Sequence, residues 1–576
     1  MSSESLSISN KSYNSSTEKQ DPTKKKKRWK WNFRDPNSPN EIYNWTLYLS
    51  IFVFGMTGMA RGMDEGTVAG NLYQESFRDI FGFNEPGRSE SFLADLRANI
   101  AGMVMIGSVG GSLISIWSID YFGRVNCLRI VCAIQVVGAL IQVFARNLPV
   151  LYVGRLIEGL GVGQTTALGP CYLSEVAMPE ARGFIVGIFN GAVYLAICLG
   201  YLSNYLTAKH MTPGDNLQWM IPVAIKVIVA GLVGLGSFVT VESPRWLIKA
   251  HKKERAVKNL CKLRNLPQEH PYIQGELKDI ETQVEMEHAK IDGYPWYLRL
   301  KHLFTRPNLF KRVFVIGIVS QLIGQWGGSN VITMYSPFLF QLATGSEGGI
   351  ENLTNTLILG VIKLCASYFV GFFLIDTLGR RICLHTGIII QGCCVLYFAL
   401  FLNLIPADDP NYTLSPSEER VALGALAALF LGGVGWVVGF NAVQYLIGPE
   451  ILDTTYRGVG AALIQFFHFV NQWANVRTVP LMMVTMQNHG AFYFLFVINV
   501  ICLIWAYICV PEIKGKSLES MDAIFELPWY MIGRKGGKVA DRSAIHQVTH
   551  HDDEGVIDLV NDDPEKGKVE YVENKK

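Results

Sequence analysis

The chain has 576 residues, of which 49% are hydrophobic and only 17% are charged. Soluble globular domains are about one quarter charged, so this composition excludes an ordinary soluble protein and indicates that much of the chain lies in a membrane. The net charge of +2 and one basic run at residues 24–28 do not predict nucleic-acid binding. The eleven cysteines show no metal-ligand spacing, and none lies in an expected external loop, so we expect neither a metal site nor a disulfide framework.

Two sets of apolar segments dominate the sequence, each segment about 20 residues or longer and therefore able to span a bilayer. The first set lies at about 43–72, 95–118, 126–146, 148–173, 184–206 and 218–241, and the second at about 309–341, 354–376, 383–405, 419–448, 457–483 and 489–511. We therefore expect an all-α membrane protein with twelve transmembrane helices, arranged as one six-helix bundle over 43–241 and another over 309–511.

Three polar segments flank these bundles. Residues 1–42 are rich in Ser, Asn and Lys and are expected to be a disordered tail, residues 242–308 have an amphipathic helical pattern, and residues 512–576 form a charged tail. With an even number of spans all three lie on one side, and they carry most of the Lys and Arg outside the spans. The positive-inside rule therefore predicts that both termini are cytosolic, with the plasma membrane as the default location.

A pair of charged motifs occurs once in each half of the chain. The pattern Asp120-x-x-Gly-Arg124 recurs as Asp376-x-x-Gly-Arg380, and Glu175 with Arg182 seven residues later recurs as Glu450 with Arg457. Two motifs in the same order at nearly the same spacing indicate an internal duplication. Parallel repeats of this kind are typical of secondary transporters.

Four further strings resemble the sugar porters of the major facilitator superfamily, especially the fungal members. They are GRLIEGLGVG at 154–163, PCYLSE…RG at 170–183, VESPRWL at 241–247 and PEIKGKSLE at 511–519. The resemblance covers about residues 45–525. It implies a major facilitator fold and a monomer that needs no cofactor. The implied function is transport of a sugar or related polyhydroxy compound by alternating access, either as facilitated diffusion or coupled to protons. No nucleophile–base constellation suggests an enzyme.

Charged residues at the cytosolic ends of the spans are expected to form a gating network. Such residues pair across the two bundles when the cytosolic side is shut and separate when it opens. The alternative is that they anchor and cap the helix ends, each pair contributing about 0–1 kcal/mol. The expected network comprises Asp120, Arg124, Glu175, Arg182 and Glu242 in the first half, and Asp376, Arg380, Glu450, Arg457 and Glu512 in the second.

Asp64, in the first span, matches the family's membrane-embedded carboxylate, and Arg155 matches its arginine partner in the fourth span. A buried acid and base are costly unless they pair, so we expect them to contact each other. The pair is a candidate for proton coupling, and the alternative is a static ion pair. Arg61 lies three residues before Asp64, on the same helix face, and a second cation there would weaken a protonation switch.

Residues 321–335, within the seventh span, contain the amides that the resemblance implies for binding sugar hydroxyls. Amides suit hydroxyls because each offers both a donor and an acceptor. The alternative is that these amides bond helices to each other within the membrane. The candidate substrate-binding residues are Gln325, Asn330, Asn190, Gln321, Tyr335, Tyr445 and His468.

The sequence departs from the family pattern at several cavity positions. Gly324 and Leu364 stand where the family has amides, and Lys226 and His468 introduce basic groups. If these basic groups, with Arg61, face the cavity, the substrate is a sugar acid or another divergent compound rather than a plain hexose; otherwise they lie at the boundary with water. A second functional alternative is a nutrient sensor that binds its ligand without transporting it, and the short C-terminal tail favours transport.

Overall fold

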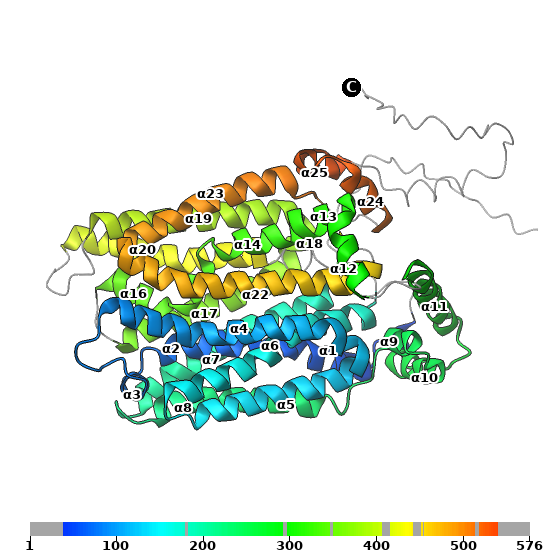
Figure 1. Cartoon of the computed structure of the whole chain (residues 1–576), viewed down its shortest axis with the longest axis horizontal. Helices are drawn as coiled ribbons and strands as arrows, with labels where there is room; N and C mark the ends of the chain where they lie inside the picture. Colours follow the sequence, from blue (N-terminus) through cyan, green and yellow to red (C-terminus); the bar gives the residue numbers. More distant parts are fainter. Residues whose placement is uncertain are drawn as a thin grey trace, which may run out of the picture. The chain divides into compact units, whose positions relative to one another are not determined.

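The computed structural model describes residues 39–178, 182–291, 296–345, 349–405, 415–441, 451–452, 454–512 and 518–538. Within these ranges the regular secondary structure is entirely helical (Figure 1). The expected tail at 1–42 lies mostly outside them, although the short helix η1 Asn40–Ile42 is described and Ile42 is buried.

Each expected span corresponds to one helix or to a short series of helices. The first half contains α1 Trp45–Gly55, η2 Met56–Gly58, α2 Met59–Asn71, α4 Glu90–Phe122, α5 Arg124–Val143, α6 Leu148–Val176, α7 Arg182–His210 and α8 Leu217–Gly236. The second half contains α13 Pro307–Phe310, η4 Lys311–Ile318, α14 Val319–Gln325, α15 Ser329–Met334, α16 Ser336–Thr344, α17 Gly349–Phe369, η5 Val370–Leu374, α18 Ile375–Leu378, α19 Arg380–Leu404, α20 Pro416–Trp436, η6 Val437–Asn441, α22 Thr454–Thr485 and α23 Gln487–Cys509.

Seven of the described helices are long and apolar enough by themselves to cross a membrane: α4, α5, Gly187–His210 of α7, α8, α19, α20 with η6, and α23. The remaining spans are interrupted or polar. The first is divided at η2, the seventh is divided between α14 and α15, and α6 carries Arg155 and Glu158 within its length. These less apolar spans are the ones that contribute most of the charged and amide side chains described below.

The break in the seventh span depends on a glycine and on two buried amides. Gly328 has φ +101°, a conformation that glycine adopts without the steric penalty of a side chain. The break leaves the carbonyl of Gly327 without a helical partner, and it accepts hydrogen bonds from Gln391 Nε2 at 2.9 Å and Asn499 Nδ2 at 2.8 Å. Irregular backbone is tolerated inside a membrane protein only where such partners exist.

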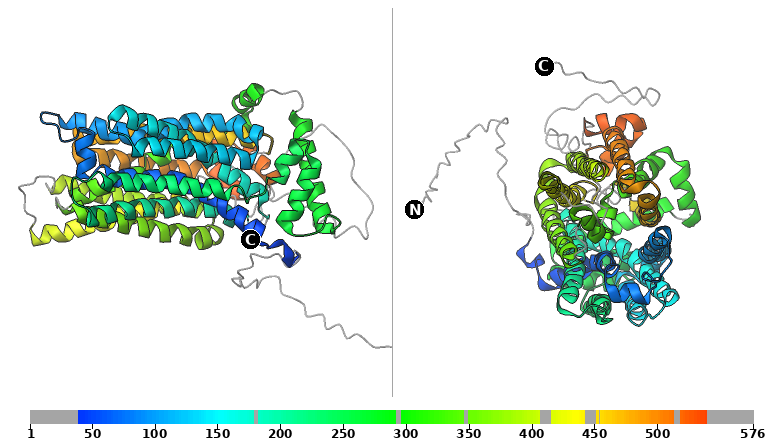
Figure 2. Two further views of the ribbon diagram at one scale, coloured as in Figure 1. Left: turned by 90° about the horizontal axis from the view of Figure 1, so that it is seen from below. Right: turned by 90° about the vertical axis from the view of Figure 1, so that its left-hand side faces the viewer.

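The two halves meet through a small number of helices. Within residues 39–538, α4 packs along α22, α7 packs along α17, and α2 contacts α15. Figure 2 shows the helices of the first half, in blue and cyan, beside those of the second half, in green to orange. Since α2, α7, α15 and α17 all lie at this junction, their facing side chains define the space between the halves.

Shorter helices lie outside the spans. They are α3 Glu75–Ile80, α9 Pro244–Lys249, α10 Lys253–Arg264, α11 Pro271–Ile291, α12 Trp296–Thr305, α24 Leu518–Glu526, α25 Trp529–Lys535 and η7 Gly536–Lys538. Arg264, at the end of α10, bonds Glu276 of α11 at 2.5 Å and the carbonyl of Val176 at 3.2 Å. This arginine therefore ties the helices that connect the halves to the end of α6.

Candidate functional site

A cavity lies between the two halves, and both halves line it. We call it the central cavity. Its lining comes from α2, α7, α14, α15, α17 and the end of α20 with η6. The lining residues are Arg61, Glu65, Val193, Tyr194, Ile197, Gln325, Ser329, Asn330, Thr333, Lys363, Trp436 and Asn441. Two of the seven residues expected to bind substrate, Gln325 and Asn330, are among them.

His468, on α22, connects two of the expected amides. Its Nδ1 atom lies 2.8 Å from Gln321 Oε1 and 3.1 Å from Gln325 Nε2, and all three side chains are buried. A carbonyl oxygen only accepts, so in the tautomer with the proton on Nδ1 this atom donates to Gln321, and it then cannot also accept from the Gln325 amide nitrogen. The other ring nitrogen, Nε2, is buried and has no partner among the described residues.

Further polar atoms at the central cavity also lack partners. Asn330 accepts a hydrogen bond from Gln472 Nε2 at 3.3 Å, while its own Nδ2 and the Gln472 Oε1 atom are buried without a partner in the described part of the chain. Asn190 Nδ2 donates to the carbonyl of Asn441 at 3.3 Å, and Asn190 Oδ1 is likewise unpartnered there. Buried polar groups are nearly always hydrogen-bonded, so this cluster indicates a polar ligand or water at the cavity.

The two remaining candidates are Tyr335 and Tyr445. Tyr335 donates its hydroxyl hydrogen bond to the carbonyl of Val476 at 3.0 Å, within the second half. This bond joins the start of α16 to α22, and a role for Tyr335 in substrate binding stays a prediction. Tyr445 lies outside the described residues.

The central cavity contains three charged side chains. Arg61 Nε lies 2.9 Å from Glu65 Oε1, and Gln472 Nε2, from the second half, donates to the same oxygen at 2.9 Å. Arg61 thus pairs with Glu65, four residues on, rather than with Asp64. The third charge is Lys363, whose Nζ donates to Thr333 Oγ1 at 2.5 Å and lies 5.8 Å from the centre of the Tyr194 ring.

Lys363 was missed by the sequence analysis, which compared the family's polar position with its neighbour Leu364. The signal was present, because Lys363 is the one charged residue in the middle of the apolar segment 354–376. An ionisable residue within a transmembrane segment is by default a candidate for function.

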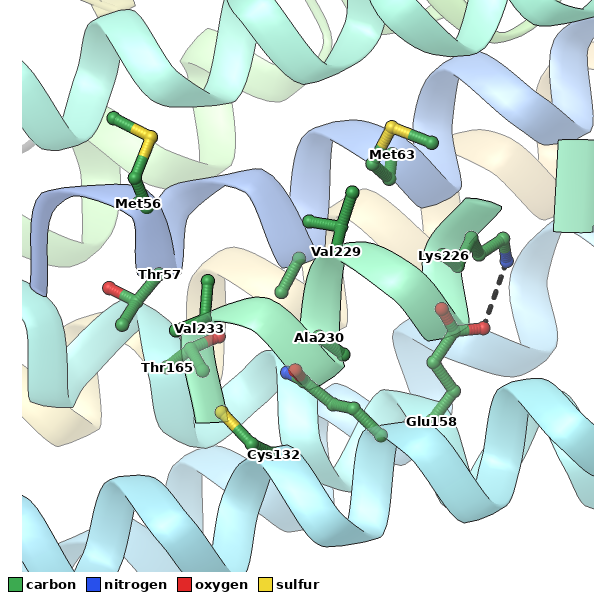
Figure 3. A pocket seen from close by; sticks show the side chains of 12 residues that line it. Met56, Thr57, Met63, Cys132, Glu158, Thr165, Lys226, Val229, Ala230 and Val233 are labelled. Carbon is green, nitrogen blue, oxygen red and sulfur yellow. Dashed lines mark hydrogen bonds and ion pairs between the residues drawn. The ribbon is translucent and has the colours of Figure 1, made fainter. Parts of the chain in front are cut away.

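A second group of charges lies inside the first half, and we call it the N-half cluster: Asp64, Arg155, Glu158 and Lys226. Arg155 donates to both oxygens of Asp64, at 3.2 and 3.3 Å. Lys226 Nζ lies 2.8 Å from Asp64 Oδ1 and 2.9 Å from Glu158 Oε2, and Figure 3 shows the latter contact. The cluster balances two carboxylates against two cations.

This arrangement corrects the expectation for Lys226. Lys226 is buried, so it does not reach the boundary with water, and both of its acidic partners belong to the first half. It therefore adds no net charge to the central cavity. The expected contact between Asp64 and Arg155 is present, but the sequence analysis did not foresee Lys226 or Glu158 beside it.

The charged motifs at the cytosolic ends form contacts within each half. Arg124 Nη2 lies 2.6 Å from Glu175 Oε1, and Arg124 Nη1 lies 3.1 Å from Asp120 Oδ1. Glu242 accepts hydrogen bonds from the backbone N–H groups of Arg124 and Val125 at 2.9 and 3.0 Å. These four members all belong to the first half, and Asp376, Glu450 and Arg457, with which they would pair across the halves, have no described side chains, so the gating network stays a prediction.

The second half repeats one of these contacts. Glu512 accepts hydrogen bonds from the backbone N–H groups of Arg380 and Arg381, at 3.2 and 3.1 Å. Glu242 and Glu512 therefore each bind the first turn of the helix that follows a glycine, with φ +86° at Gly123 and +93° at Gly379. Of the other network members, Glu450 and the side chains of Arg182, Asp376 and Arg457 lie outside the described residues.

Known proteins resemble this chain over most of its length. A family model described as sugar (and other) transporter matches residues 50–525. A probable quinate permease of Neosartorya fischeri is 30% identical over 85% of this chain and 90% of its own length, and the quinate permease of Emericella nidulans is 29% identical over 85% and 91%. The xylose transporter XylE from E. coli, in a partially occluded inward-open conformation, matches with a TM-score of 0.67 and 20% identity, over 82% of this chain and all of that one. The last comparison indicates a shared fold.

Proposed function

Since this chain belongs to the family of sugar and related transporters of the major facilitator superfamily, we propose that its central cavity is the site where the transported compound binds. The protein moves a sugar or related compound across a membrane by alternating access. The observation that carries the assignment of the site is the set of buried, unpartnered polar atoms on Asn330, His468, Gln472 and Asn190. Asn330 lines the cavity, and His468, Gln472 and Asn190 contact the lining residues Gln325, Asn330 and Asn441, so donors and acceptors at and beside the cavity suit a compound with several hydroxyl groups.

Binding at the central cavity also suits the movement of the two halves. Glu65 and Gln472 join α2 to α22, and Tyr201 of α7 donates to the carbonyl of Thr333 at 2.7 Å. These polar contacts cross between the halves beside the cavity, so a change in the relative position of the halves would break them. A ligand that replaces them would favour one arrangement over the other.

Several finer features belong to the same proposal. We propose that the protein acts as a monomer in the plasma membrane, with both termini in the cytosol, and that its activity is transport rather than chemistry. The N-half cluster, which holds Asp64 beside Arg155, is where proton movement would be coupled if transport is driven by protons. The cytosolic ion pairs of Arg124 stabilise the end of the first half and are proposed to respond to opening.

Quinate is the first compound to test, because the relatives in Neosartorya and Emericella are named quinate permeases. Uptake of radiolabelled quinate, glucose, xylose and inositol would be measured in yeast cells that lack their own transporters. Replacing Gln325 with Ala removes one buried hydrogen-bonding partner, a loss of about 1–3 kcal/mol, so the apparent affinity should fall roughly five- to a hundredfold. Surface abundance, measured in parallel, controls for misfolding.

Two results would count against this proposal. If a compound is transported and the Gln325→Ala variant handles it with unchanged affinity, the binding site lies elsewhere. If quinate stabilises the purified protein against heating but is not taken up, the protein is a sensor rather than a transporter.

A further inference from the structure

Lys363 is a buried basic residue that forms no ion pair with a described acidic side chain; Glu65 lines the same cavity but is paired with Arg61. Lys363 lies in the middle of α17 and is 1% exposed. Its ammonium group contacts the Thr333 hydroxyl and the face of the Tyr194 ring, and no acidic group of the described residues pairs with it. Burying an unpaired charge costs several kcal/mol, so a chain that retains one at a cavity indicates a use for it.

Three other buried cations of the spans, Lys226, Arg155 and Arg61, differ from Lys363 in this respect. Lys226 has two carboxylate partners within 2.9 Å, and Arg155 has Asp64. Arg61 shares the central cavity with Lys363 but is bonded to Glu65. The described lining of the central cavity therefore has one positive charge in excess, and that charge is on Lys363.

Lys363 lines the central cavity and has one hydrogen-bond partner among the described residues, so its ammonium group has donors to spare for a ligand. Thr333 Oγ1 donates to the carbonyl of Ser329 at 2.9 Å, so it accepts from Lys363 and satisfies one of three ammonium hydrogens. Asn330, on the same short helix, carries the unpartnered Nδ2 donor. A ligand oxygen between these two groups would receive hydrogen bonds from both.

We propose that Lys363 binds a carboxylate of the transported compound, and that the substrate is a polyhydroxy monocarboxylate rather than a neutral sugar. This inference rests on the proposed function of the central cavity. The Lys363 ammonium and Asn330 hold the carboxylate, while the amide of Gln325 contacts the hydroxyl groups. Glu65 lies in the same cavity and disfavours a second negative charge, so a dicarboxylate is a poor substrate.

The test compares polyhydroxy compounds that carry no carboxylate, one carboxylate or two. Uptake of D-glucose, D-glucuronate and the dicarboxylate D-glucarate, together with quinate, is measured for the whole chain in transporter-deficient yeast. The wild-type protein should transport glucuronate or quinate with a kcat/KM at least tenfold above that for glucose, and should exclude glucarate. Lys363→Gln should lower the kcat/KM for the monocarboxylates roughly ten- to a hundredfold, which is the range for one charge-assisted hydrogen bond, and leave glucose uptake unchanged or improved.

Two variants and one physical measurement separate binding from folding. Lys363→Arg keeps the charge and should retain part of the preference for acids. Cys365→Ala, on the exposed face of the same helix, should leave all rates unchanged. In purified protein, quinate should raise the melting temperature of the wild type and not that of Lys363→Gln, which would show that the variant is folded but no longer binds the acid.

The outcomes distinguish this inference from the proposed function. If neutral sugars are transported as well as their acids, and Lys363→Gln changes neither, Lys363 is structural and the inference is wrong while the transport function stands. If none of the compounds is transported or stabilises the protein, the proposed substrate class is wrong as well.

Discussion

Removing Lys226 should destabilise the first half more than removing Lys226 and Glu158 together. In the wild type, the N-half cluster balances the carboxylates of Asp64 and Glu158 with Arg155 and Lys226. Lys226→Gln leaves Glu158 with only the amide of Gln142, 2.6 Å away, and takes one of the two cations from Asp64. The variant therefore has one uncompensated negative charge in a buried site.

The size of the effect follows from this charge balance. Breaking a buried ion pair from one side costs about 3–5 kcal/mol, because the remaining charge is left without compensation. At about 2–4 °C per kcal/mol for a unit of roughly 200 residues, the melting temperature should fall on the order of 10 °C. In the double variant Glu158→Gln/Lys226→Gln, the remaining charges are Asp64 and Arg155, which still pair, so most of the loss should be recovered.

The assay is thermal unfolding of the purified protein in detergent, followed by loss of the monodisperse gel-filtration peak. Wild type, both single variants and the double variant form a cycle in which the coupling between positions 158 and 226 is measured directly. The reasoning is refuted if Lys226→Gln melts like the wild type, or if the double variant is less stable than Lys226→Gln alone. Either result would mean that the lysine and glutamate do not compensate each other.

Two further predictions concern the break in the seventh span. Gln391→Ala or Asn499→Ala alone leaves the Gly327 carbonyl with one hydrogen bond, so each variant should lose about 1 kcal/mol of stability. The double variant leaves this carbonyl buried and unsatisfied, so it should lose more stability than the two single variants together. Additive losses of melting temperature would contradict this prediction. Gly328→Ala places a side chain at φ +101°, so it should lower stability by about 1–2 kcal/mol and reduce transport. The matched control is Gly231→Ala, where an added methyl group meets no other atom within 4 Å and stability should not change. Equal melting temperatures for the two variants would show that the break does not need a glycine.

Much of the fold could be predicted from the sequence because it depends on long, repeated patterns. The apolar segments exceed the thickness of a bilayer, and the paired motifs at Asp120–Arg124 and Asp376–Arg380 indicate the duplication directly. The division of the seventh span also has a local cause, since Gly327-Gly328 supplies a conformation that other residues avoid. Each of these features is determined by a few neighbouring residues or by composition over a full span.

The site was only partly predictable because it depends on how each helix is rotated. Adjacent positions on a helix point about 100° apart, so the difference between Leu364 and Lys363 decides which side chain reaches the cavity. Similarly, Arg61 has acidic residues both three and four positions ahead of it, and only the packing against α22 selects Glu65 rather than Asp64. Lys226 and Glu158 come from different spans, and no local pattern brings them together.

We propose that the cavity between the halves binds a small polyhydroxy compound during its transport. Counterflow would be measured in proteoliposomes that contain only the purified protein, preloaded with unlabelled quinate and given radiolabelled quinate outside. We expect transient accumulation of label that is saturable, competes with related hydroxy acids, and is strongly reduced in Gln325→Ala at equal protein content. If neither quinate nor the neutral sugars show counterflow, the proposed transport is wrong. If counterflow is the same in Gln325→Ala as in the wild type, the central cavity is not the binding site.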